Sequence, residues 1–408
     1  MNPELADLSR TLFSPVALGL FLVATLGYLY AMAVTKVAVP VTDGGEAADV
    51  SGGSSGRTAL RIATAAAVLG AIALAAHIVV RGMASGRMPL GNMFEFSTIM
   101  ALTIVVAGLV VFQWRLHRPE VMGFLLLGTV LTMGAALLVY SEPGPLMPIL
   151  STAWRAIHVS AIVFAAGLFT VSFVFASLYL LRDTAERHLR ASLPGGSVGA
   201  ARAVDLGDVD DGLGTVPQRQ SPDDDLSALD GQDMDGLEDE VNADYRSRMR
   251  AAINPYRLAA GTFVGTSAVA WVFWVTDGPT RFLSVTVTMV AASLVAWWFV
   301  PYLPSASTLD AMAYRTIAFA FPIWTFAVIS GAIWAEQSWG RYWGWDPKET
   351  SAFLTWVAYA GYLHARATRG MKGRNAGWLA ILAFAVLMFT YFGVNLVVTG
   401  LHSYAGPI

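Results

Sequence analysis

Long, uninterrupted apolar runs constrain this chain more than any other feature of its sequence. Hydrophobic residues make up 55% of its 408 positions and charged residues only 13%, and many apolar runs are long enough to cross a bilayer of roughly 30 Å. Lipid offers the peptide group no hydrogen-bonding partner, so each spanning segment must satisfy its own backbone. The sequence therefore excludes a soluble globular protein and predicts an all-α fold, a polytopic transmembrane helix bundle.

Ten candidate spans follow when the apolar runs are read against charged residues and Pro or Gly breaks. They are expected near residues 12–34, 62–80, 93–112, 121–140, 154–181, 258–276, 282–300, 313–335, 351–366 and 376–398. The first run is as long as a full span and has no basic leader, so we expect an anchor there instead of a cleaved signal peptide.

Basic residues predict the orientation of these spans, because short loops rich in Lys and Arg stay in the cytoplasm. Most of them fall on one side of a ten-span arrangement: Lys36, Arg57, Arg61 and the stretches 115–118, 182–190 and 364–374. Residues 81–87 carry the two arginines that fall on the other side. We therefore expect a multi-pass protein of the plasma membrane with both termini external.

Charge and composition divide the chain into four parts. Residues 191–244 hold fourteen Asp and Glu against two Arg, and too few apolar residues to offset the entropy of folding. The predicted parts are an anchor span with a cytoplasmic loop (1–60), a first membrane part (61–190), a disordered acidic cytoplasmic linker (191–250) and a second membrane part (251–408) that contains an external tryptophan-rich segment (334–350).

Four of the thirteen tryptophans lie within twelve residues between the eighth and ninth expected spans: Trp334, Trp339, Trp343 and Trp345. One interpretation is an aromatic belt at the headgroup level of the membrane. Belts need only one or two rings per helix end, however, and glycines lie among these rings, which lets backbone approach a planar ligand closely. The pattern favours a platform for a flat apolar ligand.

The segment Trp339-Gly-x-x-Trp343-x-Trp345-Asp346, continued by Pro-Lys-Glu, resembles the "WWD" signature of haem-handling proteins. Upstream, Pro89-Leu-Gly-Asn-Met-Phe-Glu95 is similar to a Pro-Leu-x-Asn-x-x-Glu stretch of the same superfamily. The layout resembles the CcsA or ResC type of system II cytochrome c biogenesis proteins. The resemblance covers residues 60–408 apart from the acidic linker.

Two of the six histidines are expected at the outer face, next to the tryptophan-rich segment. His158 lies at the outer start of the fifth span, and His402 follows the tenth. A six-coordinate haem iron needs one axial ligand on each side, and the resemblance implies a pair of external histidines in similar contexts. His117 and His188 lie among arginines in cytoplasmic loops, where we expect solvated surface residues.

Two further histidines are candidates for a second haem station. His364 lies about nineteen residues past Trp345, roughly 20 Å below the outer surface, which is too deep to share an iron with the outer pair. The resemblance implies an intramembrane haem ligand in this helix. His77 is expected at a different depth, so for this residue the ligand and structural interpretations both stay open. The resemblance also allows the second intramembrane ligand to come from a partner protein.

The resemblance implies a holocytochrome c synthase, or haem lyase, working with a ResB-type membrane partner. The chain would present haem b externally for thioether attachment to the Cys-x-x-Cys-His motif of an apocytochrome c. This chain has no cysteine, so the sulfur would come from the substrate. Asp346 would orient a ligand imidazole and Arg341 would pair with a haem propionate, unless both only cap the following helix.

Two other functions are compatible with the sequence. The chain would be either a haem transporter or chaperone whose partner performs the ligation, or an ordinary solute carrier with an aromatic gate. Thioether formation by a purified complex separates the first alternative from a synthase, and a bound-haem spectrum separates the second. No nucleic-acid partner is expected.

Overall fold

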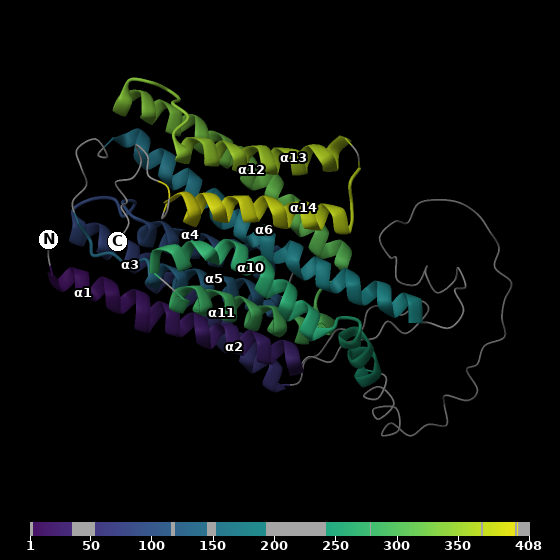
Figure 1. Ribbon diagram of the computed structural model, residues 1–408. Coiled ribbons are helices and arrows are strands. Elements are labelled where there is room, and N and C mark those ends of the chain that lie inside the picture. Colours follow the sequence, from purple (N-terminus) through teal and green to yellow (C-terminus); the bar gives the residue numbers. More distant parts are fainter. Residues whose placement is uncertain are drawn as a thin grey trace, which may run out of the picture.

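The computed structural model describes residues 3–34, 54–115, 119–144, 152–192, 242–277, 279–368, 370–395 and 398. Every regular element in these ranges is a helix (Figure 1), which confirms the predicted all-α class. The first half comprises α1 (Pro3–Thr11), η1 (Leu12–Leu18), α2 (Gly19–Val34), α3 (Ser54–Ser85), α4 (Met93–Gly108), η2 (Leu109–Arg115), η3 (Pro119–Val121), α5 (Met122–Leu138) and α6 (Ala153–Ser192). The second half comprises α10 (Pro255–Asp277), α11 (Pro279–Trp298), η5 (Val300–Tyr302), α12 (Ala306–Trp339), α13 (Pro347–Thr368), α14 (Arg374–Met388) and η6 (Phe389–Val394).

Each of the ten predicted spans coincides with a helical segment of the fold. In the described residues, six helical stretches are long and apolar enough to cross a membrane: Pro3–Val34, Ser55–Ser85, Met93–Phe112, Ala153–Ala191, Ala306–Trp339 and Arg374–Val394. Met122–Leu138 and Phe282–Trp298 are shorter apolar helices. The arrangement confirms a polytopic membrane bundle.

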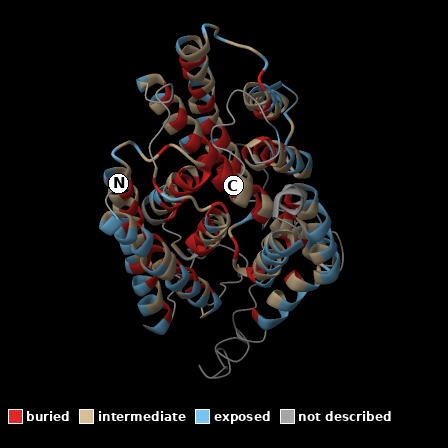
Figure 2. Ribbon diagram, turned by 60° about the vertical axis from the view of Figure 1, so that its left-hand side comes forward, coloured by how far each residue is buried: buried red, intermediate tan, exposed pale blue. Residues whose placement is uncertain are grey.

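Helix α6 is the centre of the bundle and packs along most of α12 (Figure 1). It also contacts α4 and α14. In its middle, the ring of Phe169 stacks on Tyr359 of α13 at 3.6 Å between centroids and lies 5.9 Å from Trp324 of α12. Buried residues concentrate along this axis and exposed ones on the periphery (Figure 2), where we expect lipid to lie.

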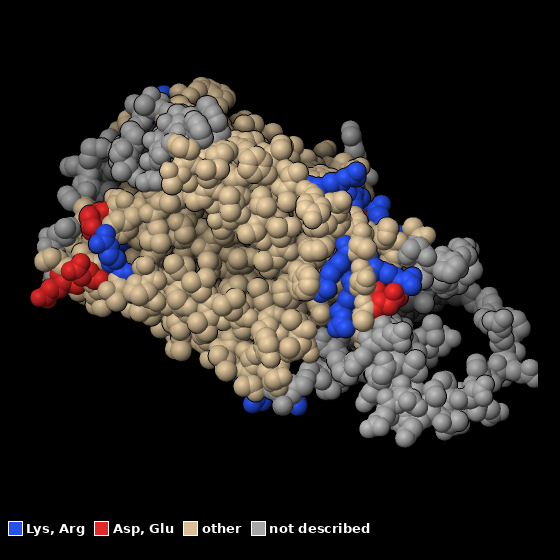
Figure 3. All heavy atoms as spheres, turned by 60° about the horizontal axis from the view of Figure 1, so that its bottom comes forward, with Lys and Arg blue, Asp and Glu red and all other residues tan. Residues whose placement is uncertain are grey.

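The two ends of the bundle differ in charge. Most lysines and arginines on the face drawn in Figure 3 gather at the end where α6 finishes and α12 begins. There, Arg366 binds Asp310 through two contacts of 2.7 and 3.1 Å, and Arg374 donates to Thr184 at 2.7 Å. The opposite end carries residues 340–346, between α12 and α13, which we call the tryptophan loop. We call these the basic end and the tryptophan end.

The predicted acidic linker, residues 191–250, lies mostly outside the described residues. Its last nine residues, 242–250, are described and form a helix, so the predicted boundary lies too far along the chain. Burial explains the difference: Met249 is fully buried, and Arg182 of α6 donates to the Tyr245 hydroxyl at 3.1 Å. The aromatic and apolar residues that begin at this point give the helix a surface to pack.

Candidate ligand site beneath the tryptophan loop

A cavity of about 190 Å³ opens between α6, α12, α13 and η6 at the tryptophan end. Its walls are mostly apolar with a few polar groups, the composition typical of small-molecule sites. Residues of six helices (α4, α6, α12, α13, α14 and η6), of the segment between α3 and α4 and of the tryptophan loop line it, among them Arg155, His158, Trp334, Trp343, Lys348 and Tyr391. Of the residues predicted from the sequence to bind a ligand, the cavity brings together His158 and Trp343.

The ring of His158 is held in one orientation by α12. Its Nδ1 lies 2.7 Å from the carbonyl oxygen of Ala327. A carbonyl only accepts hydrogen bonds, so Nδ1 carries the hydrogen and the neutral ring has its lone pair on Nε2. A histidine that ligates a metal usually has this arrangement, with one nitrogen donating to a backbone carbonyl and the other facing the metal.

Packing fixes the same ring from two further directions. Trp334 stacks on His158 with a centroid distance of 6.0 Å and an interplanar angle of 24°. Gly331 presents bare backbone to the ring, and a β-carbon at that position would lie 2.7 Å from two of the ring atoms. Trp334 is one of the four clustered tryptophans from which the sequence predicts a ligand platform, whereas no pattern in the sequence marked Gly331. Both lie on the α12 face that meets α6, which only the packing of these two helices identifies.

A capping box joins the tryptophan loop to α13. Asp346 is the N-cap residue, because its Oδ1 accepts from the Lys348 N–H at 3.1 Å, and Pro347 occupies the first helical position. Glu349 reaches back and accepts through Oε2 from the N–H groups of Gly344 at 2.8 Å and Asp346 at 3.2 Å. Asp346 therefore caps the helix, and its orientation of a ligand imidazole stays a prediction.

The loop adopts a backbone that bulky residues rarely take. Trp345 has φ +57°, in the left-handed region where side chains larger than glycine cost free energy. The two N–H groups on either side of Trp345 are the ones that Glu349 binds, so the carboxylate holds this conformation. The Trp345 ring is 68% exposed and lies 5.9 Å from Trp343, almost perpendicular to it.

Two further residues that the sequence predicted to bind the ligand, Trp339 at the end of α12 and Arg341 in the tryptophan loop, are not among the described residues that line the cavity. The ring of Trp339 lies 5.2 Å from that of Trp334, tilted against it. Arg341 lies with its guanidinium directly against Gly344, where any β-carbon would collide with it. The loop thus places rings both in the cavity wall and on the outer surface.

Two cationic residues for which the sequence predicted no ligand contact also line the cavity, Arg155 and Lys348. Arg155 precedes His158 by one helical turn, and its NH1 donates to the carbonyl oxygen of Leu90 at 2.6 Å. Lys348 lies in the first turn of α13, ahead of the expected span. Burial lowers the pKa of its ammonium group to about 8, although the Asp346 carboxylate acts in the opposite direction.

The other candidate histidines lie away from this cavity. His77 is fully buried in α3, where Phe13 and Phe94 pack on its ring and Nδ1 lies 3.0 Å from the Ser9 hydroxyl. His364 lies seventeen residues past Pro347, roughly 26 Å along α13 toward the basic end, and is exposed on the outside of the bundle. The structure does not bring these two histidines together. His402 lies outside the described residues.

Comparisons with known proteins identify the family of this chain. Residues 90–402 match the cytochrome C assembly protein family. The chain is 30% identical over 340 residues to the cytochrome c biogenesis protein CcsA of Microcystis aeruginosa, covering 82% of this chain and 84% of that protein. It is 31% identical over 353 residues to CcsA of Rippkaea orientalis, covering 84% and 87% of the two chains. Over a shorter stretch of 99 residues, 24% of this chain and 30% of the relative, identity to CcsA of Synechococcus elongatus reaches 54%. The chain belongs to the cytochrome c assembly family and is a cytochrome c biogenesis protein of the CcsA type.

Proposed function

We propose that this chain is the haem-handling subunit of a holocytochrome c synthase and that it presents haem b at the tryptophan end to apocytochrome c. The observation that carries the proposal is His158. Its hydrogen bond to Ala327 leaves the lone pair on Nε2, and its ring lines the same cavity as Trp343. An imidazole so arranged beside an aromatic wall suits axial ligation of an iron porphyrin.

The second axial ligand would be His402, as the sequence predicts. The histidine of the Cys-x-x-Cys-His motif in the substrate would then replace one of the two, which provides a release step. Haem here is the cargo of the reaction, held until apocytochrome c arrives.

The size of the cavity supports presentation of haem over its enclosure. Sites that enclose a drug-sized ligand usually measure about 300–1,000 Å³, whereas this cavity measures about 190 Å³. Part of a porphyrin ligated to His158 would extend beyond the cavity, alongside the exposed ring of Trp345. A porphyrin edge outside the cavity is accessible to the thiols of an unfolded substrate.

Thioether attachment mainly requires that the haem be held in the right orientation toward the substrate thiols. Thioether formation adds a thiol S–H across a vinyl C=C bond, so a C–S bond forms, the hydrogen ends on the former vinyl group, and there is no leaving group. Residues that hold the ring in place remove part of the entropic barrier to this addition. Arg155 and Lys348 are our candidates for binding the haem carboxylates, alongside the Arg341 predicted from the sequence.

A membrane partner of the ResB type fits the position of His364. This histidine is exposed on the outside of α13, toward the basic end, and His77 lies elsewhere in the fold. If His364 ligates haem at an inner station, the second ligand would come from a neighbouring protein. We further propose that the tryptophan end faces the outside of the plasma membrane and the basic end the cytoplasm.

An absorption spectrum of the purified protein, alone and with its partner, tests the proposal. We expect a low-spin bis-imidazole haem spectrum that His158→Ala converts to high-spin or removes, and partial recovery on adding imidazole. An unchanged spectrum in His158→Ala would overturn the axial assignment. If the purified complex binds haem but forms no thioether bonds, the chain would be a haem chaperone. If the wild-type protein binds no haem, the solute-carrier alternative would be favoured.

A further inference from the structure

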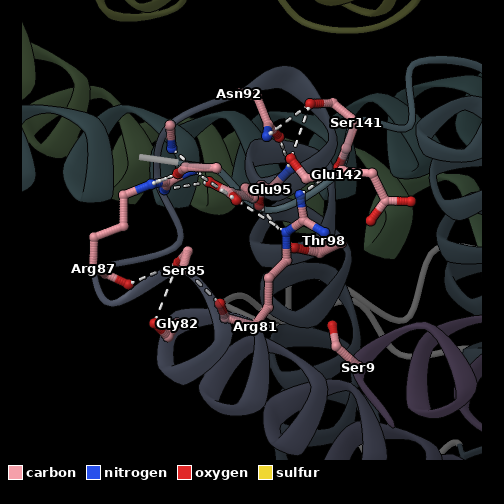
Figure 4. Close-up of polar contacts among 12 residues, drawn as sticks. Ser9, Arg81, Gly82, Ser85, Arg87, Asn92, Glu95, Thr98, Ser141 and Glu142 are labelled. Atoms are coloured by element: carbon pink, nitrogen blue, oxygen red, sulfur yellow. Dashed lines mark hydrogen bonds and ion pairs between the residues drawn. The ribbon is translucent and has the colours of Figure 1, made fainter. Parts of the chain in front are cut away.

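A carboxylate is buried among arginines at the start of α4. Glu95 is 0% exposed, and its carboxylate binds Arg81 Nε at 2.9 Å and Arg87 NH1 at 2.9 Å. The Gly91 N–H also donates to it at 2.6 Å. Figure 4 shows Glu95 between the two arginines, with Asn92 above it. A charge removed so fully from water persists only when its partners are fixed in place.

Local structure explains why this carboxylate lies here. Asn92 is the N-cap of α4 and accepts from the Glu95 N–H at 2.9 Å, so Glu95 occupies the third helical position. A negative charge in the first turn is favoured by the helix dipole. Asn92 and Glu95 also belong to the Pro-Leu-x-Asn-x-x-Glu stretch. The physical role of these two residues is to cap the helix and to form the buried ion pairs.

The carboxylate organises the loop between α3 and α4. Arg87 crosses this loop, with Nε donating to the Gly144 carbonyl at 2.8 Å and NH1 to that of Met88 at 2.9 Å. Its guanidinium lies so close to Gly91 that a β-carbon there would be 2.7 Å away. Glu95 therefore ties together both ends of the loop and the segment that follows α5.

The same loop forms one wall of the cavity that contains His158. Leu90 and Gly91 line the cavity, and the carbonyl oxygen of Leu90 accepts from Arg155 NH1 at 2.6 Å. Arg155 is itself buried and lies one turn before His158 on α6. A chain of direct contacts thus runs from Glu95 through Gly91 and Leu90 to Arg155, beside the histidine.

We propose that Glu95 is a positioning residue for the haem cavity, acting through Leu90 and Arg155 on the wall beside His158. This inference rests on the proposed function, because it assigns Glu95 a part in holding the ligand. If Glu95 had a purely structural role, replacing it would lower the amount of folded protein and would leave the ligand bound per folded molecule unchanged.

The test uses full-length chain purified with its partner. Glu95→Gln keeps the shape of the side chain but turns an amide toward two guanidinium groups. We expect haem per folded protein to fall and haem loss to an acceptor protein to become on the order of tenfold faster, with a shifted absorption spectrum. In Glu95→Gln/Arg155→Lys the loss should be less than the product of the two single effects, because both changes act on one chain of contacts.

Two further variants keep the result interpretable. Gly91→Ala displaces the guanidinium of Arg87 from its ion pair with Glu95 without removing any charged group, so it tests the loop even if Glu95→Gln does not fold. Glu142→Gln is the matched control, because Glu142 makes an exposed ion pair with Arg10 beside the same cluster and should behave as wild type. Wild-type haem binding with unchanged spectra and haem loss in Glu95→Gln or Gly91→Ala would overturn the positioning role alone. Absence of haem from the wild type would overturn the proposed function.

Discussion

At the residue scale, the position of the His158 ring depends on the lack of a side chain at Gly331. Gly331→Ala places a carbon 2.7 Å from the ring, a separation that requires the ring to move from the Ala327 carbonyl. We expect weaker iron ligation, at a cost of about 1–3 kcal/mol, the range typical of overpacking a filled site. The low-spin absorbance of haem per folded protein measures the loss.

Gly361→Ala is the control for this substitution. Gly361 lies in α13, and a β-carbon added there would have no other atom within 4 Å, so alanine fits without contact. Haem binding should be unchanged, and the helix should gain up to about 1 kcal/mol because alanine is the better helix former. If Gly331→Ala kept the full low-spin spectrum, the close approach of Gly331 would not determine the ring position.

A second prediction at this scale concerns pH. Because the pKa of Lys348 is lowered to about 8, its ammonium group is charged below that pH and neutral above it. A bound carboxylate would raise this pKa, so haem retention should be highest below pH 8 and fall only as the pH rises through and beyond 8. Lys348→Arg should retain haem to higher pH, since a guanidinium stays charged. The rate of haem transfer to an acceptor protein, followed across pH 8, tests this, and identical profiles for the two proteins would contradict it.

The sequence predicted some site residues and missed others for a physical reason. His158 and Trp343 were predicted from their chemistry and from the side of the membrane to which their spans lead. Arg155 and Gly331 were missed, because their part in the cavity depends on which helix faces meet. One signal was present in the sequence: Arg155 precedes His158 by three residues, the spacing that places two side chains on one helix face.

At the scale of elements, the tryptophan loop allows a test of the ligand platform against the aromatic belt. Trp343 lines the cavity, whereas Trp378 is 57% exposed on α14 near the basic end. Trp343→Ala should weaken haem retention by about 1–3 kcal/mol, because it removes a ring that contacts the ligand. Trp378→Ala is the control and should leave the haem-to-protein ratio unchanged. A full haem complement and normal cytochrome c maturation in Trp343→Ala would favour the belt.

Helix ends were predicted less well than helix positions. Apolar runs mark only the part of a helix that lies in lipid, so α3 and α6 extend well past the predicted spans 62–80 and 154–181. The predicted ninth span, 351–366, likewise starts four residues after α13 begins at Pro347, although the residues of the capping box, Asp346, Pro347 and Glu349, are present in the sequence. The left-handed backbone at Trp345 was not predictable, since it depends on the carboxylate that binds its neighbours.

At the scale of the whole molecule, the unequal charge of the two ends predicts how the bundle sits in the membrane. The basic end carries most of the visible lysines and arginines (Figure 3). If this end is cytoplasmic, the tryptophan loop faces the outside, where apocytochrome c would meet it. The chain contains no cysteine, so single cysteines report on either end without background.

We therefore predict opposite labelling of two exposed positions by a membrane-impermeant maleimide. Glu142 lies at the tryptophan end and Thr368 at the end of α13 near the basic end, and both side chains are exposed. In intact cells Glu142→Cys should react and Thr368→Cys should not, whereas after permeabilisation both should react, which controls for intrinsic accessibility. Reaction of Thr368→Cys alone in intact cells would place the tryptophan loop in the cytoplasm. The haem cavity would then open away from an external apocytochrome c, and presentation of haem outside the cell would be wrong even if His158 binds iron.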